Sequence, residues 1–562
     1  MDLIVLYIKS TPNDEEPEKL NIFTIGDATV SPIRFNPFYI QEGVHLQVHI
    51  DYLKAIFNAS FSLYGPMPSI VEKCLHAIYI KKGWNLTLGT HPNFVDSKGG
   101  YDGEQYQFEE HFYCFPTLTD LKDEIDRYIK KELDYKGELR DNIRTAIIVR
   151  LESLCVGAKG LMFNTHDFFS IKQLLSQNTI LEMENLADDD DKAFFVGLIL
   201  VLISEYRQKE NPAVNPGMGN KGLRHFMVIE EAHRLLKNVE TERTTEMMGN
   251  PKGKAVEVFC NILSEMRSLG QGVAVVEQIP SKISPDVIKN SNTKIVHRLV
   301  SKDDQGLLAG SLSIDDYDAL YLNRLKTGHA LCHKEGMGRP VECAVLSDVN
   351  SHAISDDKVK RSMASLAREP LHDYQAYQLD TLIGKAGKEL VIKFFNSLVT
   401  LQSDELDKLI SMAKDELQKL LVLRDVQYRI DDLFFSDYFT LQVMVLLNKG
   451  MYCRNNRIPS NLKTILLRVI RTPSEETKTE IINSLNTLWD PFPAKNFIED
   501  VIESLTIRYL YKNSSAVGLA EVESAVSSFL LLVDKDMIRK ISQKVSNKME
   551  GVHARTSYSD CN

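Results

Sequence analysis

The stretch Phe226-Met227-Val228-Ile229-Glu230-Glu231-Ala232-His233 decides the fold. Four apolar residues are too few for a helix and follow a turn at Gly222, so they predict a buried strand of a parallel sheet. Ligands of open α/β sheets bind just beyond the carboxyl ends of the strands, and this strand ends on two carboxylates. One can hold Mg²⁺ while its neighbour orients an attacking water. The alternative is a strand that runs into a helical turn, whose N-terminus favours acids.

Composition limits the class of protein. The chain has 562 residues, of which 43% are hydrophobic and 25% charged, as in soluble proteins with more than one domain. It has neither an apolar run of about 18 residues nor a basic signal-peptide start, which favours the cytoplasm. Eight scattered cysteines without a C-x-x-C pair indicate reduced thiols. A net charge of −11 argues against a uniformly basic nucleic-acid surface but allows a basic channel.

Apolar periodicity predicts alternating strands and helices, which is typical of a parallel α/β sheet with helices on both faces. A mostly helical insertion is expected at about 45–175. The predicted strands are 3–8, 21–25, 179–185, 226–229, 272–276 and 294–299. The main predicted helices are 45–63, the segment after Pro68, a segment that Pro116 to Leu121 opens and that reaches about Leu133, 139–155, 192–207 and 256–268.

Two details concern helix starts. The four acids Asp188 to Asp191 precede an apolar helix, so we interpret them as capping residues and not as a metal site. Thr119 or Asp120 is the expected cap of the helix that follows Pro116.

After residue 350 the pattern changes. The α/β core is assigned to 1–350, a polar linker to 351–375, an all-α domain to 376–550 and a flexible tail to 551–562. Residues 351–370, polar and mixed in charge, suit either a linker or a solvated helix. The apolar residues of the helical domain are interpreted as its core.

Three predicted strand ends carry polar groups toward one sheet edge. They offer Glu230 with Glu231, Glu277 with Gln278, and Arg298. Gln278 can hydrogen-bond a γ-phosphate or its attacking water, and Arg267 can reach a neighbouring subunit's site and stabilise phosphoryl charge. The alternatives are that Arg267 complements its own helix C-terminus and that Gln278 caps a turn.

The ordered set of these motifs resembles the C-terminal half of a HerA-type ATPase core, from the HerA/FtsK superfamily of hexameric DNA-pumping motors. The resemblance covers about residues 20–345. Its motifs are Val228 to His233, the series Ser264, Arg267 and Gly270, Gln278 to Ser281, Asn292 to Leu299, and Arg34-Phe35-Asn36-Pro37-Phe38. It implies a P-loop NTPase (RecA-like) fold that binds ATP and Mg²⁺.

The same resemblance implies roles for individual residues. Glu230 would lie near Mg²⁺ and Glu231 would be the catalytic carboxylate. Gln278 would sense the γ-phosphate, Arg267 would be a trans arginine finger, and Arg298 would be a second arginine near the nucleotide.

One departure from the family concerns the phosphate-binding loop. The motif needs Gly, four residues, then Gly-Lys-Ser/Thr. Only Gly253-Lys254, Gly384-Lys385 and Gly387-Lys388 are Gly-Lys pairs, and none satisfies it. Three explanations stay open: a phosphate loop on an upstream segment, a fragment that keeps the fold without activity, or a degenerate subunit used as a scaffold or activator. We expect weak or no ATP binding by this chain alone.

The leading hypothesis is therefore part of a HerA-like DNA translocase. It would form a hexamer if complete, act on double-stranded DNA with a nuclease or effector partner, and work in DNA processing or phage defence. The alternatives are a secretion or conjugation motor of the same superfamily and a non-enzymatic scaffold that keeps the fold.

Overall fold

The structure is a computed structural model. It describes residues 3–8, 20–41, 43–61, 63–91, 114–133, 137–166, 168–210, 222–239, 250–345, 354–364, 383–394 except 385, 388, 392 and 393, 406–423, 429–449, 462–481 except 478, and 523, 539 and 542–547. The predicted tail 551–562 and much of the predicted all-α domain, including 482–522 and 524–538, lie outside these residues. Contacts divide the chain into two compact units, 1–78 with 86–89 and 116–370, and 79–85 with 90–115 and 371–562.

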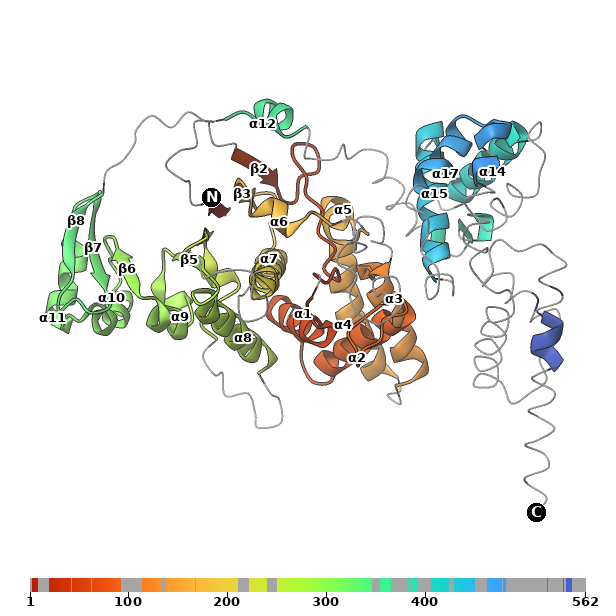
Figure 1. Ribbon diagram of the computed structural model, residues 1–562. Helices are drawn as coiled ribbons and strands as arrows, with labels where there is room; N and C mark the ends of the chain where they lie inside the picture. The colour runs from red at the N-terminus through yellow and green to blue at the C-terminus, as the bar shows by residue number, and fades with distance from the viewer. Residues whose placement is uncertain are drawn as a thin grey trace, which may run out of the picture. The chain divides into compact units, whose positions relative to one another are not determined.

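The first unit is built on a five-stranded sheet with the order β2-β3-β1-β4-β5. Figure 1 labels three of these strands, β2, β3 and β5. The strands are β1 (Leu3–Ile8), β2 (Leu20–Thr24), β3 (Asn178–Glu182), β4 (His225–Glu230) and β5 (Gln271–Val276). Pairing is parallel between β2 and β3 and between β4 and β5, but β1 is antiparallel to both β3 and β4. The expectation of a wholly parallel sheet is therefore corrected to a mixed sheet. The spacing of strands along the sequence indicates that they share a sheet. It does not indicate whether two neighbouring strands are parallel or antiparallel, because that depends on the path of the long segments that connect them.

β2, β3, β4 and β5 share one direction, because β3 and β4 both run opposite to β1. Their carboxyl ends therefore meet at one edge of the sheet. This edge carries the residues just after Thr24, Glu182, Glu230 and Val276.

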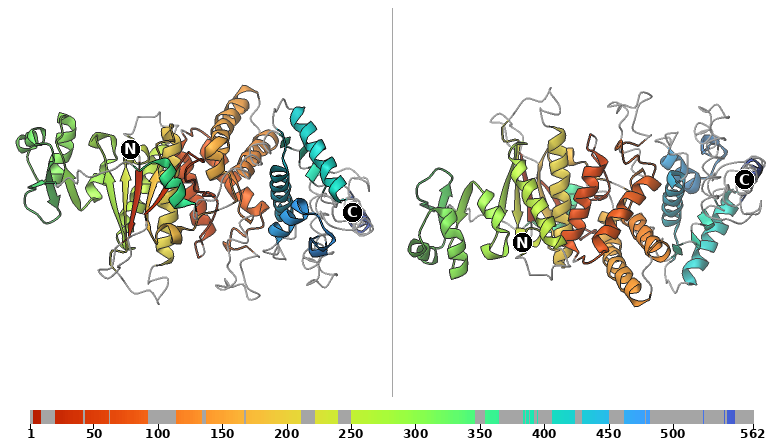
Figure 2. Two further views of the ribbon diagram at one scale, coloured as in Figure 1. Left: turned by 90° about the horizontal axis from the view of Figure 1, so that it is seen from above. Right: turned by 90° about the horizontal axis from the view of Figure 1, so that it is seen from below.

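Helices lie on both sides of this sheet (Figures 1 and 2). α8 (Pro251–Met266) contacts β5 on one side together with α7 (Asp189–Lys209), whereas α12 (Asp356–Met363) contacts β2 on the other. Helix α12 falls in the segment expected to be a linker. It packs because Val359 and Met363 are buried, and the Met363 sulfur accepts a hydrogen bond from the Ile22 N–H at 3.5 Å.

The connection from β2 to β3 is helical, as expected for 45–175. It contains α1 (Leu46–Ser60), α2 (Met67–Lys81), α3 (Leu118–Lys131), α4 (Glu138–Cys155), α5 (Gly157–Phe163) and α6 (Ile171–Leu174). The cap of α3 is Thr117, in a reciprocal capping box with Asp120, and not Thr119 or Asp120. Thr119 instead bonds the Asn164 side chain.

The core of the first unit is centred on α7. Sixteen of its residues are buried, because α1 and α8 both pack on it. Phe194 and Phe195 each lie within ring-contact distance of Phe163. The Asp188 side chain accepts the Asp190 N–H at 2.9 Å, so the predicted capping role of these acids is confirmed.

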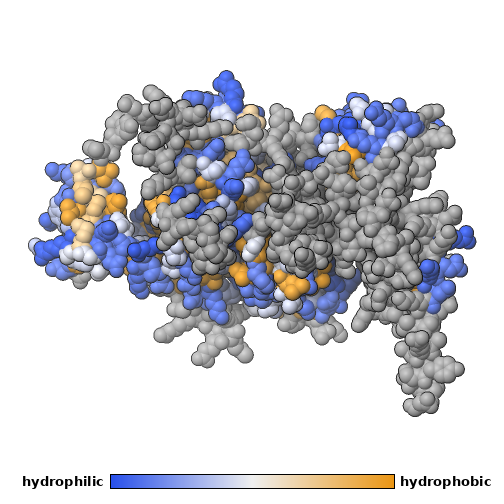
Figure 3. Space-filling view, viewed as in Figure 1, coloured by the Kyte–Doolittle hydropathy of each residue, from blue (hydrophilic) through white to orange (hydrophobic). Residues whose placement is uncertain are grey.

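The expected strand at 294–299 is correct in type but belongs to a second, three-stranded antiparallel sheet with the order β6-β7-β8. This module comprises α9 (Pro285–Asn290), β6 (Thr293–Val296), α10 (Lys302–Ala309), α11 (Asp316–Ala319), β7 (His329–Lys334) and β8 (Val341–Ala344). Val296, Leu308 and Leu331 contribute to its own core. Figure 3 shows apolar residues on the surface of this module. Ile295 and Val341 are 62% and 51% exposed.

The described secondary structure of the second unit after residue 370 is helical. Its long helices are α14 (Leu406–Val422), α15 (Asp432–Lys449) and α17 (Leu462–Arg471). Phe434, Phe435 and Tyr438 of α15 are fully buried with Leu417 and Val469 in one apolar core. This agrees with the interpretation of the apolar periodicity as core.

Candidate functional site

Glu231 directly follows strand β4 and begins the site. Glu230 is the last residue of the strand and lies beside Val276 of β5. The next residue, Glu231, adopts a left-handed backbone conformation with φ 52° and ψ 43°, and a short 3-10 turn, Ala232–Arg234, follows. A non-glycine residue in this region carries backbone strain, which persists only where the surroundings enforce it.

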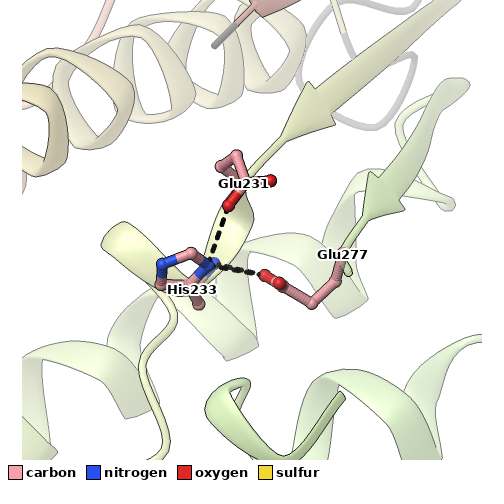
Figure 4. Close-up of side chains that lie close together, drawn as sticks. All are labelled: Glu231, His233 and Glu277. Atoms are coloured by element: carbon pink, nitrogen blue, oxygen red, sulfur yellow. Dashed lines mark hydrogen bonds and ion pairs between the residues drawn. The ribbon is translucent and has the colours of Figure 1, made fainter. Parts of the chain in front are cut away.

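Three side chains converge just beyond the ends of β4 and β5 (Figure 4). His233 Nδ1 lies 2.8 Å from Glu277 Oε2 and 3.4 Å from Glu231 Oε2. The side chains of Glu231, His233 and Glu277 are 20%, 16% and 8% exposed, so the cluster is accessible but mostly enclosed.

Glu277 is the fixed member of this cluster. Its Oε1 accepts the backbone N–H groups of Gln278 at 2.9 Å and Ile279 at 3.1 Å. Its Oε2 accepts the backbone N–H of His233 at 3.1 Å in addition to the imidazole contact. Charge-assisted bonds of this kind hold the carboxylate in one orientation.

The loops that carry the cluster are joined to each other. The Asn238 N–H donates to the Lys282 carbonyl at 2.6 Å, and the Ser284 N–H donates to the Leu236 carbonyl at 2.8 Å. Arg234 forms an ion pair with Asp189 at the start of α7. The loop after β4 is therefore fixed to both the loop after β5 and the helix that follows β3.

The start of α7 is strongly acidic. Burial raises the pKa of Asp191, an effect opposed by the Lys159 ammonium at 2.6 Å. Burial likewise raises the pKa of Asp190, with Lys252 as the main opposing charge. A helix N-terminus normally attracts anions, but here aspartates already occupy that position.

The predicted site residues are only partly brought together. Glu230, Glu231 and Gln278 lie at the same edge, with Gln278 exposed directly after Glu277. Arg298 does not, because it follows β6 in the second sheet, where it is exposed. The expectation that three strand ends share one sheet edge is therefore wrong for the third.

Arg267 lies at the opposite edge. It is exposed at the C-terminus of α8, four residues before β5 begins at Gln271. A six-residue strand spans about 20 Å, which is more than an arginine side chain can reach. Within one chain, Arg267 therefore cannot reach Glu231.

His233 was not identified as a site residue from the sequence, and Glu277 was noted only as a polar strand end. The sequence signal that could have indicated Glu277 is that it directly follows an apolar run, as Glu230 does. The contact between His233 and Glu277 joins loops 44 residues apart, and no local pattern encodes it.

The fold and site thus define an α/β protein with a glutamate–histidine cluster at the carboxyl edge of a parallel strand pair. Over 80 residues, the chain is 34% identical to the DNA double-strand break repair helicase HerA of Pyrococcus furiosus. The chain is related to the HerA/FtsK type of P-loop ATPase. The match spans 14% of this chain and only 12% of the length of that helicase.

Other comparisons are more distant. VirB4 of Thermoanaerobacter pseudethanolicus has a TM-score of 0.42 and 13% identity, covering 58% of this chain and 76% of that one. The genome packaging NTPase B204 of Sulfolobus turreted icosahedral virus 2, in complex with AMP, has a TM-score of 0.22 and 16% identity, covering 32% and 73%. No protein-family model matches the chain. In the described part of the chain, no helix is long and apolar enough to span a membrane.

Proposed function

We propose that the chain is part of a HerA-like motor in which ATP hydrolysis drives the movement or processing of DNA. The observation that carries the proposal is the position of Glu230 and Glu231 at the carboxyl end of β4, where four strands of one direction end. The sequence relationship to HerA supports the same class of activity.

The carboxylates fit a hard divalent cation. Mg²⁺ takes oxygen ligands and is commonly bound through one or two carboxylates together with phosphate oxygens. Glu230 is the proposed Mg²⁺ ligand, and Glu231, directly after it, is the proposed acceptor of a proton from the attacking water.

The phosphate part of such a site does not fit the described residues. At this edge the first turn of α7 is acidic and would repel phosphate. None of the 562 residues forms the Gly-rich phosphate loop motif. The proposal therefore requires phosphate-binding groups beyond those described, and we derive no step of phosphoryl transfer from this chain.

The other residues have proposed supporting roles. Gln278, exposed beside Glu277, would contact the γ-phosphate, and Arg267 would act on the site of a neighbouring copy. Arg298 lies outside the five-stranded sheet, so its proposed proximity to the nucleotide requires a neighbouring copy as well.

The hexameric state, double-stranded DNA, a nuclease or effector partner, a role in phage defence and a cytoplasmic location belong to the same proposal. A secretion or conjugation motor and a non-enzymatic scaffold are the alternatives. The latter would tolerate loss of Glu231, whereas a motor would not.

Steady-state ATP turnover tests the proposal. We expect slow Mg²⁺-dependent turnover at high ATP concentration, stimulated by double-stranded DNA and abolished by Glu231→Gln, which removes the charge without changing the shape. Glu265→Gln, on the exposed face of α8, is the matched control and should leave turnover unchanged. Turnover that survives Glu231→Gln, or turnover that double-stranded DNA does not stimulate, contradicts the proposal.

Mixing of variants tests the role of Arg267. Arg267→Ala and Glu231→Gln should each be inactive alone, because one lacks the finger and the other the water-orienting carboxylate. A mixture should regain turnover at interfaces that combine an intact Glu231 with an intact Arg267 from the neighbouring copy. A mixture as inactive as its components argues against a trans finger.

A further inference from the structure

The cluster of Glu231, His233 and Glu277 contains a nitrogen ligand, which a magnesium site does not require. Mg²⁺ and Ca²⁺ are bound by oxygen, whereas imidazole is a preferred ligand of Zn²⁺ and the later transition metals. Two carboxylates with one imidazole therefore favour a different ion from the one that Glu230 would hold.

We propose that Glu231, His233 and Glu277 form a binding site for a Zn²⁺-class divalent cation. Zinc bonds to nitrogen and oxygen are about 2.0–2.2 Å long, so tetrahedral ligand atoms lie roughly 3.3–3.6 Å apart. The separation of 3.4 Å between His233 Nδ1 and Glu231 has this spacing, whereas the 2.8 Å hydrogen bond between His233 Nδ1 and Glu277 has to lengthen by about 0.5 Å. All three ligand atoms lie within 4.8 Å of one another, so small side-chain shifts complete the geometry.

Hydrogen bonds fix the orientation of the proposed ligands in the absence of an ion. The Gln278 and Ile279 N–H groups fix Glu277, and the His233 backbone N–H binds the same carboxylate. Partners of this kind orient metal ligands in known sites. The left-handed backbone of Glu231 turns the chain sharply at the end of β4, and the carboxylates of Glu231 and Glu277 both face the His233 imidazole.

Three protein ligands leave one tetrahedral position open. Zinc sites of this composition keep a water or another small ligand there. The affinity order of the divalent metals further predicts that Zn²⁺ binds more tightly than Mn²⁺. Because Mg²⁺ prefers oxygen ligands, excess Mg²⁺ should compete poorly.

One consequence rests on the proposed function. Glu231 is the carboxylate assigned to the attacking water, and a bound zinc ion would occupy it. Zinc would therefore inhibit turnover, and its removal by a chelator would restore it.

Calorimetric titration of the chelator-treated full chain with ZnCl₂, in excess Mg²⁺ and without nucleotide, tests the site. Cys343→Ser serves as the background, because Cys343 is exposed and lies near Cys332, and this pair can bind zinc through sulfur. In that background, His233→Gln and Glu277→Gln should each weaken zinc binding at least about tenfold. His297→Gln, on an exposed histidine of the second sheet, is the matched control and should bind as the background does.

X-ray absorption of the zinc-loaded chain provides a readout that needs no substitution at the cluster. The proposal expects nitrogen and oxygen neighbours, including one imidazole, in the Cys343→Ser background. Absence of zinc binding, unchanged affinity in both cluster variants, or sulfur coordination would overturn it. Zinc binding is measured without nucleotide, so the result does not depend on whether the chain hydrolyses ATP. Equally, a failure to bind zinc would not contradict the ATPase proposal.

Discussion

The buried pair formed by His49 of α1 and Glu205 of α7 allows a quantitative prediction. Both side chains are 0% exposed, and His49 Nδ1 lies 2.8 Å from Glu205 Oε1. His49 Nε2 lies 3.1 Å from the Pro37 carbonyl, which can only accept, so Nε2 carries a hydrogen. Among the described residues, Glu205 Oε2 has no hydrogen-bond partner, so His49 alone compensates the carboxylate.

The three substitutions should differ in cost. His49→Leu leaves a buried carboxylate without its partner, and such losses cost about 3–5 kcal/mol of unfolding free energy. Glu205→Gln should cost only about 1 kcal/mol, because its amide can donate to Nδ1 of a neutral imidazole. The double variant His49→Leu/Glu205→Leu removes both polar groups and should recover most of the loss.

The assay has to read the first unit alone, since the chain forms two compact units. Hydrogen exchange of α1 and α7 peptides across a urea series gives that local free energy of unfolding. Ser204→Ala is the matched control, because the Ser204 hydroxyl is buried and has no described hydrogen-bond partner. It should change stability by less than about 0.5 kcal/mol. A His49→Leu cost below about 1 kcal/mol, or a double variant as unstable as His49→Leu, would refute the reasoning.

Three further outcomes are expected. Burial lowers the pKa of His225 to about 4, so the unfolded chain binds one more proton than the folded chain as the pH falls through about 6.5. About 3 kcal/mol of the free energy of unfolding should therefore be lost between about pH 6.5 and about pH 4. In a plot of the urea midpoint against pH, His225→Leu should flatten this part of the curve. Thr117→Ala should destabilise α3 by about 1 kcal/mol in hydrogen exchange, whereas Thr117→Ser should retain the cap. Burial raises the pKa of Cys155 to about 12, so its alkylation at pH 8 should be roughly a thousandfold slower than that of the exposed Cys343. Mass spectrometry of the alkylated chain measures both rates, and equal rates would contradict the prediction.

Local patterns predicted the elements well where a single period dominates. The apolar run before Glu230 became β4, and the segment 192–207 became most of α7. The acids at the start of α7 were correctly interpreted as a cap, because the capping bond involves residues two positions apart. Thr117 was missed by two residues, since Thr119 is an equally good cap by type and only the bond to Asn164 decides between them.

Non-local features were not predictable in the same way. Nothing in Leu3–Ile8 indicates that this strand runs against its neighbours, because strand direction depends on connections far along the chain. The pairing of Thr293–Val296 with β7, in a sheet of its own, was likewise not predictable, because it also depends on connections beyond the strand itself. At the site, the sequence pointed to Glu230 and Glu231 at the end of β4, but the partner of His233 lies on another loop.

The central position of β1 has a consequence for synthesis. Its partners are more than 170 residues downstream, and Ile4 pairs with Ile229. At roughly 5–20 residues per second, a ribosome needs roughly 10–45 s to make the intervening 225 residues. Until Glu182 has been made, the middle strand of the sheet has neither neighbour, and from then until β4 is made it has only β3. Nascent chains should therefore depend on a chaperone that shields residues 3–8 until β4 has left the exit tunnel.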